Sequence, residues 1–307
     1  MTPPDDEPAT QPALEALPAH EANLGGGMVV QRALPHRLRR RVGAWCFLDH
    51  YGPVTLAAKA GGMQIGPHPH MGLQTVSWLY EGAVLHRDSL GSLQLIQPGQ
   101  LNLMTAGRGI SHSEETPAAH PPGLHGLQFW IALPESRRNG EPAFDHHPSL
   151  PQITRDGLAL TLIVGQALGE RSPAKVYSDM AGLDVVCRDS GTRELPLKAA
   201  FEHALVLIEG EMTLEGQPMA PGTLYYLGLG RESISLGNRG PARAFLLGGA
   251  PMKEDVLLWW NFVGRSTEEM AAARAEWEGH AARFGEVRGF DGARLVAPEL
   301  TTKLRAR

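Results

Sequence analysis

The residues best suited to chemistry form two short pairs, His68-x-His70 and His112-x-Glu114. In each pair the side chains stand at positions i and i+2, which in an extended strand point to the same face, roughly 7 Å apart along the chain. Two neighbouring strands that carry such pairs could direct three imidazoles and one carboxylate at one point. This donor set predicts a mononuclear metal site made of His68, His70, His112 and Glu114.

A single His-x-His pair is more often a surface pair or two satisfied polar residues than a metal site. Here the spacing occurs twice, and the second pair ends in a carboxylate. Glycines adjoin both pairs, at Gly66 and Gly72 and at Gly107 and Gly109, where the backbone is able to turn tightly. The pattern therefore favours a metal site on the strands of an antiparallel barrel.

The composition points to an all-β protein. A content of 36 Gly and 24 Pro suits many short strands joined by turns. Both halves of the chain contain a strand-like run that ends in an acidic-Gly turn, 75–80 before Glu81-Gly82 and 204–208 before Glu209-Gly210. We therefore expect two tandem jelly-roll-like barrels.

The ligand-type residues are concentrated in the first barrel. Of the 13 histidines, all but His203 and His280 lie at or before His147. The second half contains neither a His-x-His nor a His-x-Glu pair, so we expect it to hold no metal.

Four segments are expected along the chain. Residues 1–27 are rich in Pro, Ala and Glu and should be a disordered tail. Residues 28–147 should form the metal-binding barrel and residues 148–264 the second barrel, with a helix and tail over residues 265–307.

The C-terminal helix carries its own start signal. Ser266 followed by Glu269 is a capping box. Apolar residues then recur at helical spacing, up to an expected end at Gly285: Met270, Ala273, Trp277, Ala281 and Phe284.

Charge and cysteine content exclude several classes of partner and location. A net charge of −5 argues against nucleic acid as a partner, and the alternation Arg37-Leu38-Arg39 suggests the solvent face of a strand. No apolar run approaches the ~20 residues of a membrane helix, and the acidic start opposes a signal peptide. With only Cys46 and Cys187 and no CxxC, we expect a reduced, cytoplasmic protein without membrane contact.

Some residues near the ligand pairs are candidates for the walls of a pocket. Gln128 interrupts an otherwise apolar run and should have a polar partner, so we expect it to face the pocket. His86 and Asp88 favour a cross-strand polar contact. Trp78 and Met104 are candidates for an apolar wall.

From about Val42 to Pro298 the chain resembles the pirin family, a branch of the two-domain cupins. The resemblance rests on these segments: residues 68–70, 86–91 (HRDSLG), 106–114 (AGRGISHSE), 126–130 (GLQFW) and 260–263 (WNFV). It implies a bicupin whose N-terminal barrel binds one divalent metal, commonly iron(II), at the positions of His68, His70, His112 and Glu114. Copper, nickel, manganese or zinc would also suit such a donor set.

The chain departs from the family around the first pair. Many pirins have Arg, Phe and Glu where this sequence has Met71, Leu73 and Gln74. Other cupins use a carboxylate near position 74 as a ligand. Because Gln74 is an amide, Glu114 must supply the oxygen ligand here.

The resemblance implies two functions that use the same ligands. Pirins are similar to flavonol 2,3-dioxygenases, which open quercetin with dioxygen and release carbon monoxide. In that case Glu114 would also act as the general base toward the flavonol 3-hydroxyl. Pirins also resemble metal-dependent regulators that bind a transcription factor or a metabolic enzyme. A zinc-dependent sugar-phosphate isomerase is disfavoured, since only Arg87 and Arg108 lie near the motif.

Overall fold

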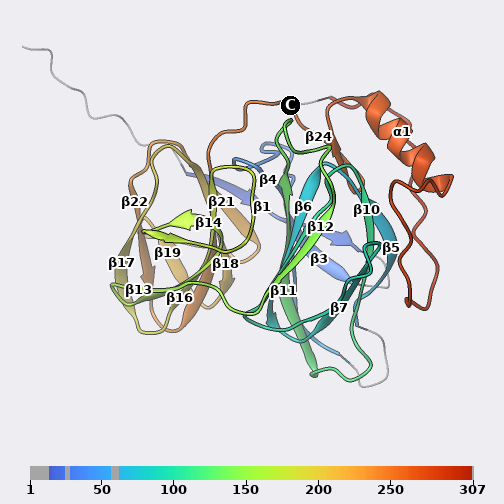
Figure 1. Cartoon of the computed structure of the whole chain (residues 1–307). Helices are drawn as coiled ribbons and strands as arrows, with labels where there is room; N and C mark the ends of the chain where they lie inside the picture. Colours follow the sequence, from blue (N-terminus) through green and yellow to red (C-terminus); the bar gives the residue numbers. More distant parts are fainter. Residues whose placement is uncertain (1–13, 25–27, 57–61, 306–307) are drawn as a thin grey trace, which may run out of the picture.

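The protein consists of two β-domains that lie side by side (Figure 1). The computed structural model describes residues 14–24, 28–56 and 62–305. The N-terminal domain pairs a 7-stranded sheet with a 4-stranded sheet, and the C-terminal domain pairs an 8-stranded sheet with a 4-stranded sheet. This confirms the expected all-β fold of two jelly-roll-like cupin domains, although each domain is a pair of sheets rather than one closed barrel.

The metal-ligand pairs lie on the small sheet of the N-terminal domain. This sheet has the order β5 (Gln64–His70), β10 (Ile110–Glu115), β7 (Val84–Asp88) and β8 (Leu93–Ile96). The large sheet has the order β12 (Ala143–His147), β9 (Leu101–Thr105), β6 (Leu73–Glu81), β11 (Gly123–Ala132), β4 (Trp45–Thr55), β3 (Val29–Leu34) and β2 (His20–Asn23).

The C-terminal domain repeats this strand order. Its large sheet runs β1 (Glu15–Pro18), β21 (Thr223–Gly228), β18 (Glu202–Glu209), β23 (Ala242–Gly249), β16 (Met180–Cys187), β14 (Leu158–Ala167) and β13 (Gln152–Arg155), with β15 (Glu170–Arg171) beside β14. Its small sheet runs β17 (Gly191–Pro196), β22 (Ser233–Asn238), β19 (Met212–Leu214) and β20 (Gln217–Pro218). The strands β17 and β22 therefore correspond to β5 and β10, but their sequences contain no histidine.

A hydrophobic core joins the large sheets of the two domains. Trp45 and Phe129 of the N-terminal domain pack against Phe245 of the C-terminal domain, with ring centroids 4.6–6.5 Å apart. The indole Nε1 of Trp45 donates to the carbonyl of Gly248 at 3.1 Å. Strand β6 is buried on both faces because Val76 faces this shared core while Leu73 faces the core of its own domain. The two domains are thus one packed unit.

The expectation of a disordered tail over residues 1–27 is wrong for the part that the structure describes. Residues 15–18 form β1, which pairs with β21 of the C-terminal domain, and residues 20–23 form β2, which pairs with β3. Leu17 is 1% exposed in the core between the domains. Pairing at a sheet edge uses backbone groups, so it overrides the tail-like composition. Residues 1–13 and 25–27 lie outside the described residues.

The C-terminal segment returns to the N-terminal domain. It forms a hairpin of β24 (Leu257–Trp259) and β25 (Phe262–Gly264), then α1 (Thr267–Glu278), which lies on the outer side of the N-terminal domain (Figure 1). Met270, Ala273 and Trp277 of the helix pack with Met71 and Phe262. No helix in the described ranges is long and apolar enough to cross a membrane.

The start of α1 is as predicted, and its end is not. Ser266 Oγ accepts from the backbone N–H of Glu269 at 3.1 Å, and the Glu269 carboxylate accepts from the N–H of Arg265 at 2.8 Å. The helix ends at Glu278, with Gly279 as its C-cap, rather than at Gly285. His280 follows with a φ of 55°, a left-handed conformation that stops the helix.

The basic run before β4 is a loop, so the expectation of a strand face over Arg37-Leu38-Arg39 is wrong. His36 and Arg39 exchange two backbone hydrogen bonds, of 2.9 and 3.1 Å, which turn the chain. The Arg39 guanidinium pairs with Glu15 and lies 3.5 Å from the centre of the Tyr226 ring. Arg39 thus fastens the loop to β1 and β21 instead of facing solvent.

Candidate metal centre

Three of the four predicted ligands come together on β5 and β10. The strands are antiparallel, with His112 directly opposite His68. The potential ligand nitrogens of His68, His70 and His112 all lie within 4.8 Å of one another. Their ring centroids are 4.3–5.0 Å apart. Strand alternation, which places His68 and His70 on one face, is the reason for this convergence.

The protons on His68 and His70 are positioned by backbone carbonyls. His68 Nδ1 lies 2.9 Å from the carbonyl oxygen of Gly66, and His70 Nδ1 lies 3.1 Å from that of Asn261. A carbonyl oxygen only accepts, so each Nδ1 must carry the proton. The Nε2 atom of each ring is then an unprotonated lone pair, as a metal ligand requires.

A series of hydrogen-bonded side chains fixes the position of the proton on His112. His86 Nε2 lies 3.1 Å from the Asp88 carboxylate and therefore carries a proton, so His86 Nδ1 is free to accept. His112 Nδ1, at 3.4 Å, donates to it, and His112 Nε2 is left unprotonated. Asp88 is held in turn by the backbone N–H groups of Leu90 and Ser92. The expected cross-strand polar contact is the one between His86 of β7 and His112 of β10, whereas the His86–Asp88 hydrogen bond lies within β7.

Burial keeps the three imidazoles neutral. It lowers the pKa of His68 to about 4. It also holds the pKa values of His70 and His112 well below the usual range, and the imidazoles beside these two residues lower their pKa values further. Metal binding requires the neutral form. His112 Nε2 is buried and has no hydrogen-bond partner. Since buried polar atoms are almost always satisfied, this atom fits a metal ligand.

Glu114 lies on the same cavity but outside the histidine group. The register of β10 against β5 shifts between His112 and Glu114, so that Glu114 stands opposite Ile65. Its carboxylate is not part of the group whose ligand atoms lie within 4.8 Å, although it lines the cavity. Burial raises the pKa of Glu114. Its role as the fourth ligand stays a prediction from sequence.

The cavity above the histidines has a volume of about 410 Å³. Segments distant in sequence enclose it: His20, Asn23 and Leu24 near the N-terminus, and Leu258, Trp260, Asn261 and Leu295 near the C-terminus. These residues were not predicted from the sequence, because nothing in their local pattern marks them as neighbours of β5 and β10. Residues 28–147, the expected N-terminal barrel, therefore supply only part of the lining of this cavity.

Among the expected wall residues, Gln128 lines the cavity and accepts a hydrogen bond from Ser77 Oγ at 2.8 Å. Trp78 and Met104 were wrongly expected in the wall. Trp78 is buried in the core between the domains, and Met104 is buried in the core of the N-terminal domain.

One wall is instead a stack of aromatic and charged groups. Phe47 stacks on Trp130 with ring centroids 3.9 Å apart and planes inclined by 12°. The Arg32 guanidinium lies 4.5 Å from the centre of the Phe47 ring. Arg32 also makes two hydrogen bonds, of 2.8 and 2.7 Å, to the fully buried carboxylate of Asp49. This wall offers a flat apolar surface beside a fixed ion pair.

Comparison with known proteins agrees with this fold and assigns the family. Residues 27–131 match the Pirin family, and residues 182–285 match the Pirin C-terminal cupin domain. A Pseudomonas aeruginosa protein named "Putative quercetin 2,3-dioxygenase" is 46% identical over 95% of this chain and 92% of its own length. Human pirin is 30% identical over 83% of this chain and 88% of its own length. The chain belongs to the pirin family of bicupins.

Solved structures share this fold. The crystal structure of a quercetin 2,3-dioxygenase from Acinetobacter baumannii superposes with a TM-score of 0.93 and 43% identity, covering 95% of this chain and 97% of that one. A bacterial pirin from Escherichia coli, solved with nickel(II), superposes with a TM-score of 0.61 and 19% identity, covering 78% of this chain and 100% of that one. At that identity the second likeness concerns the fold alone.

Proposed function

We propose that this protein is a metal-dependent dioxygenase that opens the central ring of flavonols such as quercetin, with dioxygen as co-substrate and release of carbon monoxide. The observation that carries the proposal is the set of three neutral imidazoles whose Nε2 atoms are all left unprotonated. The similarity to a protein named as a quercetin dioxygenase supports the choice of substrate.

His68, His70 and His112 would hold one divalent transition metal, with Glu114 as the fourth ligand. Iron(II) is the first choice, and copper, nickel, manganese and zinc also suit these donors. When bound, the metal would supply a Lewis acid and a redox partner for dioxygen. The buried chain from His112 through His86 to Asp88 would keep the third imidazole in one orientation and one tautomer.

The remaining chemistry falls to residues of the cavity. Glu114 would remove the proton from the flavonol 3-hydroxyl, and its raised pKa brings the carboxylate closer to the value that suits a general base near neutral pH. The stacked pair Phe47 and Trp130 would pack against the flat substrate. The N- and C-terminal segments that enclose the cavity would exclude water from it.

The test is aerobic incubation of iron(II)-loaded and metal-stripped protein with quercetin, followed by flavonol absorbance and carbon monoxide release. Metal-dependent loss of flavonol with carbon monoxide is the expected result. Glu114→Gln should abolish turnover and retain most of the metal. An absence of turnover with iron, copper, nickel and manganese would contradict the proposal and favour a metal-dependent regulator that binds a protein partner.

A further inference from the structure

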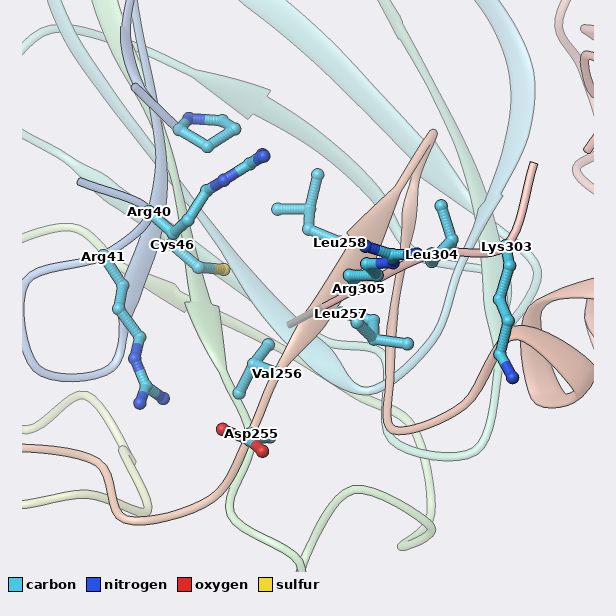
Figure 2. Close-up of a pocket in the computed structure, with 11 residues that line it drawn as sticks. Arg40, Arg41, Cys46, Asp255, Val256, Leu257, Leu258, Lys303, Leu304 and Arg305 are labelled. Carbon is cyan, nitrogen blue, oxygen red and sulfur yellow. The ribbon is translucent and has the colours of Figure 1, made fainter. Parts of the chain in front are cut away.

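A second cavity, of about 400 Å³, lies next to the metal cavity. It is formed by the loop between β3 and β4, by β24, and by residues 303–305 near the C-terminus (Figure 2). Pro35 and Leu258 line both cavities. The two cavities therefore share a wall, and the proposed dioxygenase activity does not use this second one.

Positive charge dominates the lining. Figure 2 shows Arg40 and Arg41 on one side of the cavity and Lys303 and Arg305 on the other. Asp255 is the one carboxylate among the lining residues that the structure describes. The surplus of cations is local, because the chain as a whole has a net charge of −5. The positive electrostatic potential of this cavity would attract an anion.

These cations are not neutralised by neighbours. Arg41 donates to the backbone carbonyls of Glu254 and Met252 at 2.9 and 2.8 Å, which fixes its guanidinium without cancelling its charge. Arg40, Lys303 and Arg305 take part in none of the ion pairs formed within the described part of the chain. Their donors are available to a ligand.

The rest of the lining is apolar: Val256, Leu257, Leu258 and Leu304. Cys46 adds a buried thiol, and burial raises the pKa of this thiol to about 12, so it contributes no negative charge. A cavity of this size and lining has room for a ring or a short hydrocarbon body as well as a charged group.

We propose that this cavity binds a small organic oxyanion, a molecule with an apolar body and a terminal carboxylate or phosphate. Arg40 and Arg305, which line different sides of the cavity, would bind the oxyanion through charge-assisted hydrogen bonds. The apolar body would pack against Leu258, on the wall shared with the metal cavity. The proposal is independent of the reaction that the metal centre performs.

The test is calorimetric titration of the full chain with benzoate and with phenyl phosphate, and with benzamide as the uncharged analogue. At least one anion should bind at one site per chain and more weakly at high salt, whereas benzamide should not bind. The tighter anion identifies the preferred headgroup. Both forms of the protein, metal-loaded and metal-stripped, are titrated, because an anion is also able to ligate a metal.

Matched variants distinguish anion binding in this cavity from nonspecific attraction to surface charge. Arg40→Gln with Arg305→Gln should weaken binding at least about tenfold, since two charge-assisted donors are lost. Arg37→Gln, which removes an exposed charge from the same loop but does not line the cavity, should leave binding unchanged. Circular dichroism and thermal unfolding confirm that each variant is folded.

Three results would overturn the proposal. The first is the failure of both anions to bind at millimolar concentration. The second is binding that disappears when the metal is removed, which would assign the anion to the metal centre. The third is equal weakening by the Arg37 variant and the double variant, which would show nonspecific attraction.

Discussion

His70 Nδ1 lies 3.1 Å from the carbonyl oxygen of Asn261, a residue 191 positions further along the chain. Asn261 sits at the turn between β24 and β25. The hairpin is attached to the N-terminal domain by the hydrogen bond from Val263 N–H to the Met71 carbonyl, at 3.0 Å. The orientation of one candidate metal ligand on β5 therefore depends on a segment that follows the entire second domain.

The buried ring of Phe262 should matter for metal affinity although it touches no metal. Phe262, the first residue of β25, is 0% exposed and stacks on Phe284 with ring centroids 5.7 Å apart. We expect Phe262→Ala to loosen the hairpin and the Asn261 carbonyl, and to weaken metal binding by roughly 10- to 100-fold, as loss of a ligand's hydrogen-bond partner does. Titration of the metal-stripped variant with iron(II) or nickel(II) measures this.

A matched variant distinguishes this effect from general destabilisation. Phe201 is also buried, at 1% exposure, but lies in the C-terminal domain. Both Phe→Ala changes should lower the free energy of unfolding by about 3–5 kcal/mol. Only the Phe262 variant should lose metal affinity. Equal losses in both variants would show that metal binding merely follows global stability.

The histidine cluster makes a direct prediction for metal content. His112→Ala removes one of three converging nitrogens together with its hydrogen bond to His86, so the variant should purify with little metal. His203→Ala removes a histidine that is equally buried but lies in the C-terminal domain, and it should keep the full complement. Elemental analysis after identical loading gives the comparison. Full metal occupancy in the His112 variant would contradict the assignment.

Strand β1 should contribute to stability as part of the C-terminal domain. Leu17 is 1% exposed in the core between the domains. Leu17→Ala should therefore lower the free energy of unfolding by about 2–5 kcal/mol, measured by urea denaturation. Leu38, which is 68% exposed, is the control, and Leu38→Ala should change stability by less than about 0.5 kcal/mol. Equal stability of both variants would mean that β1 is not docked in solution.

The pH dependence of stability should show the burial of Asp184. Burial raises the pKa of Asp184 to about 6, and Arg243, 3.6 Å away, only partly offsets this. The pKa of Asp184 in the folded state is above the ordinary value of 3.8, so its contribution to the free energy of unfolding is fully present below about pH 3.8. This contribution is lost as the pH rises through about 6.

Asp184→Asn stays uncharged and should escape this loss. Between about pH 4 and about pH 8, the unfolding free energy of the variant should improve relative to the original protein by at most about 3 kcal/mol. Asp189→Asn, at an exposed position, should show no such trend. Taking the difference between variant and original removes the opposite contributions of buried histidines such as His50 and His203, whose pKa values burial lowers to about 4. A flat difference would contradict the prediction.

The parts of the site that were predictable depend on local periodicity. His68 and His70 are two residues apart in a strand, so residue type and spacing suffice to place both rings on one face. Gln128 was predictable as a polar residue in a buried strand. The capping box at Ser266 was predictable because Ser and Glu three residues apart provide acceptors for backbone N–H groups at a helix start, here those of Glu269 and Arg265.

The parts that were not predictable depend on contacts between distant segments. Asn261 acts through its backbone carbonyl, which every residue type possesses, so its side chain carries no signal of the role. Leu17 lies in a Pro- and Glu-rich stretch, and its order comes from pairing with β21. The end of α1 was misplaced because Phe284 is buried after the helix has ended, so that its burial continues the apolar pattern without helical structure.

The two ends of the chain are exchanged between the domains. Strand β1 forms the edge of the C-terminal sheet, at the position that β12 occupies in the N-terminal sheet, while the β24–β25 hairpin and α1 cover the N-terminal domain. A protease cut in the connection after β12 would thus yield two fragments that each retain a piece of the other's architecture. Such fragments should stay associated and fold only in each other's presence.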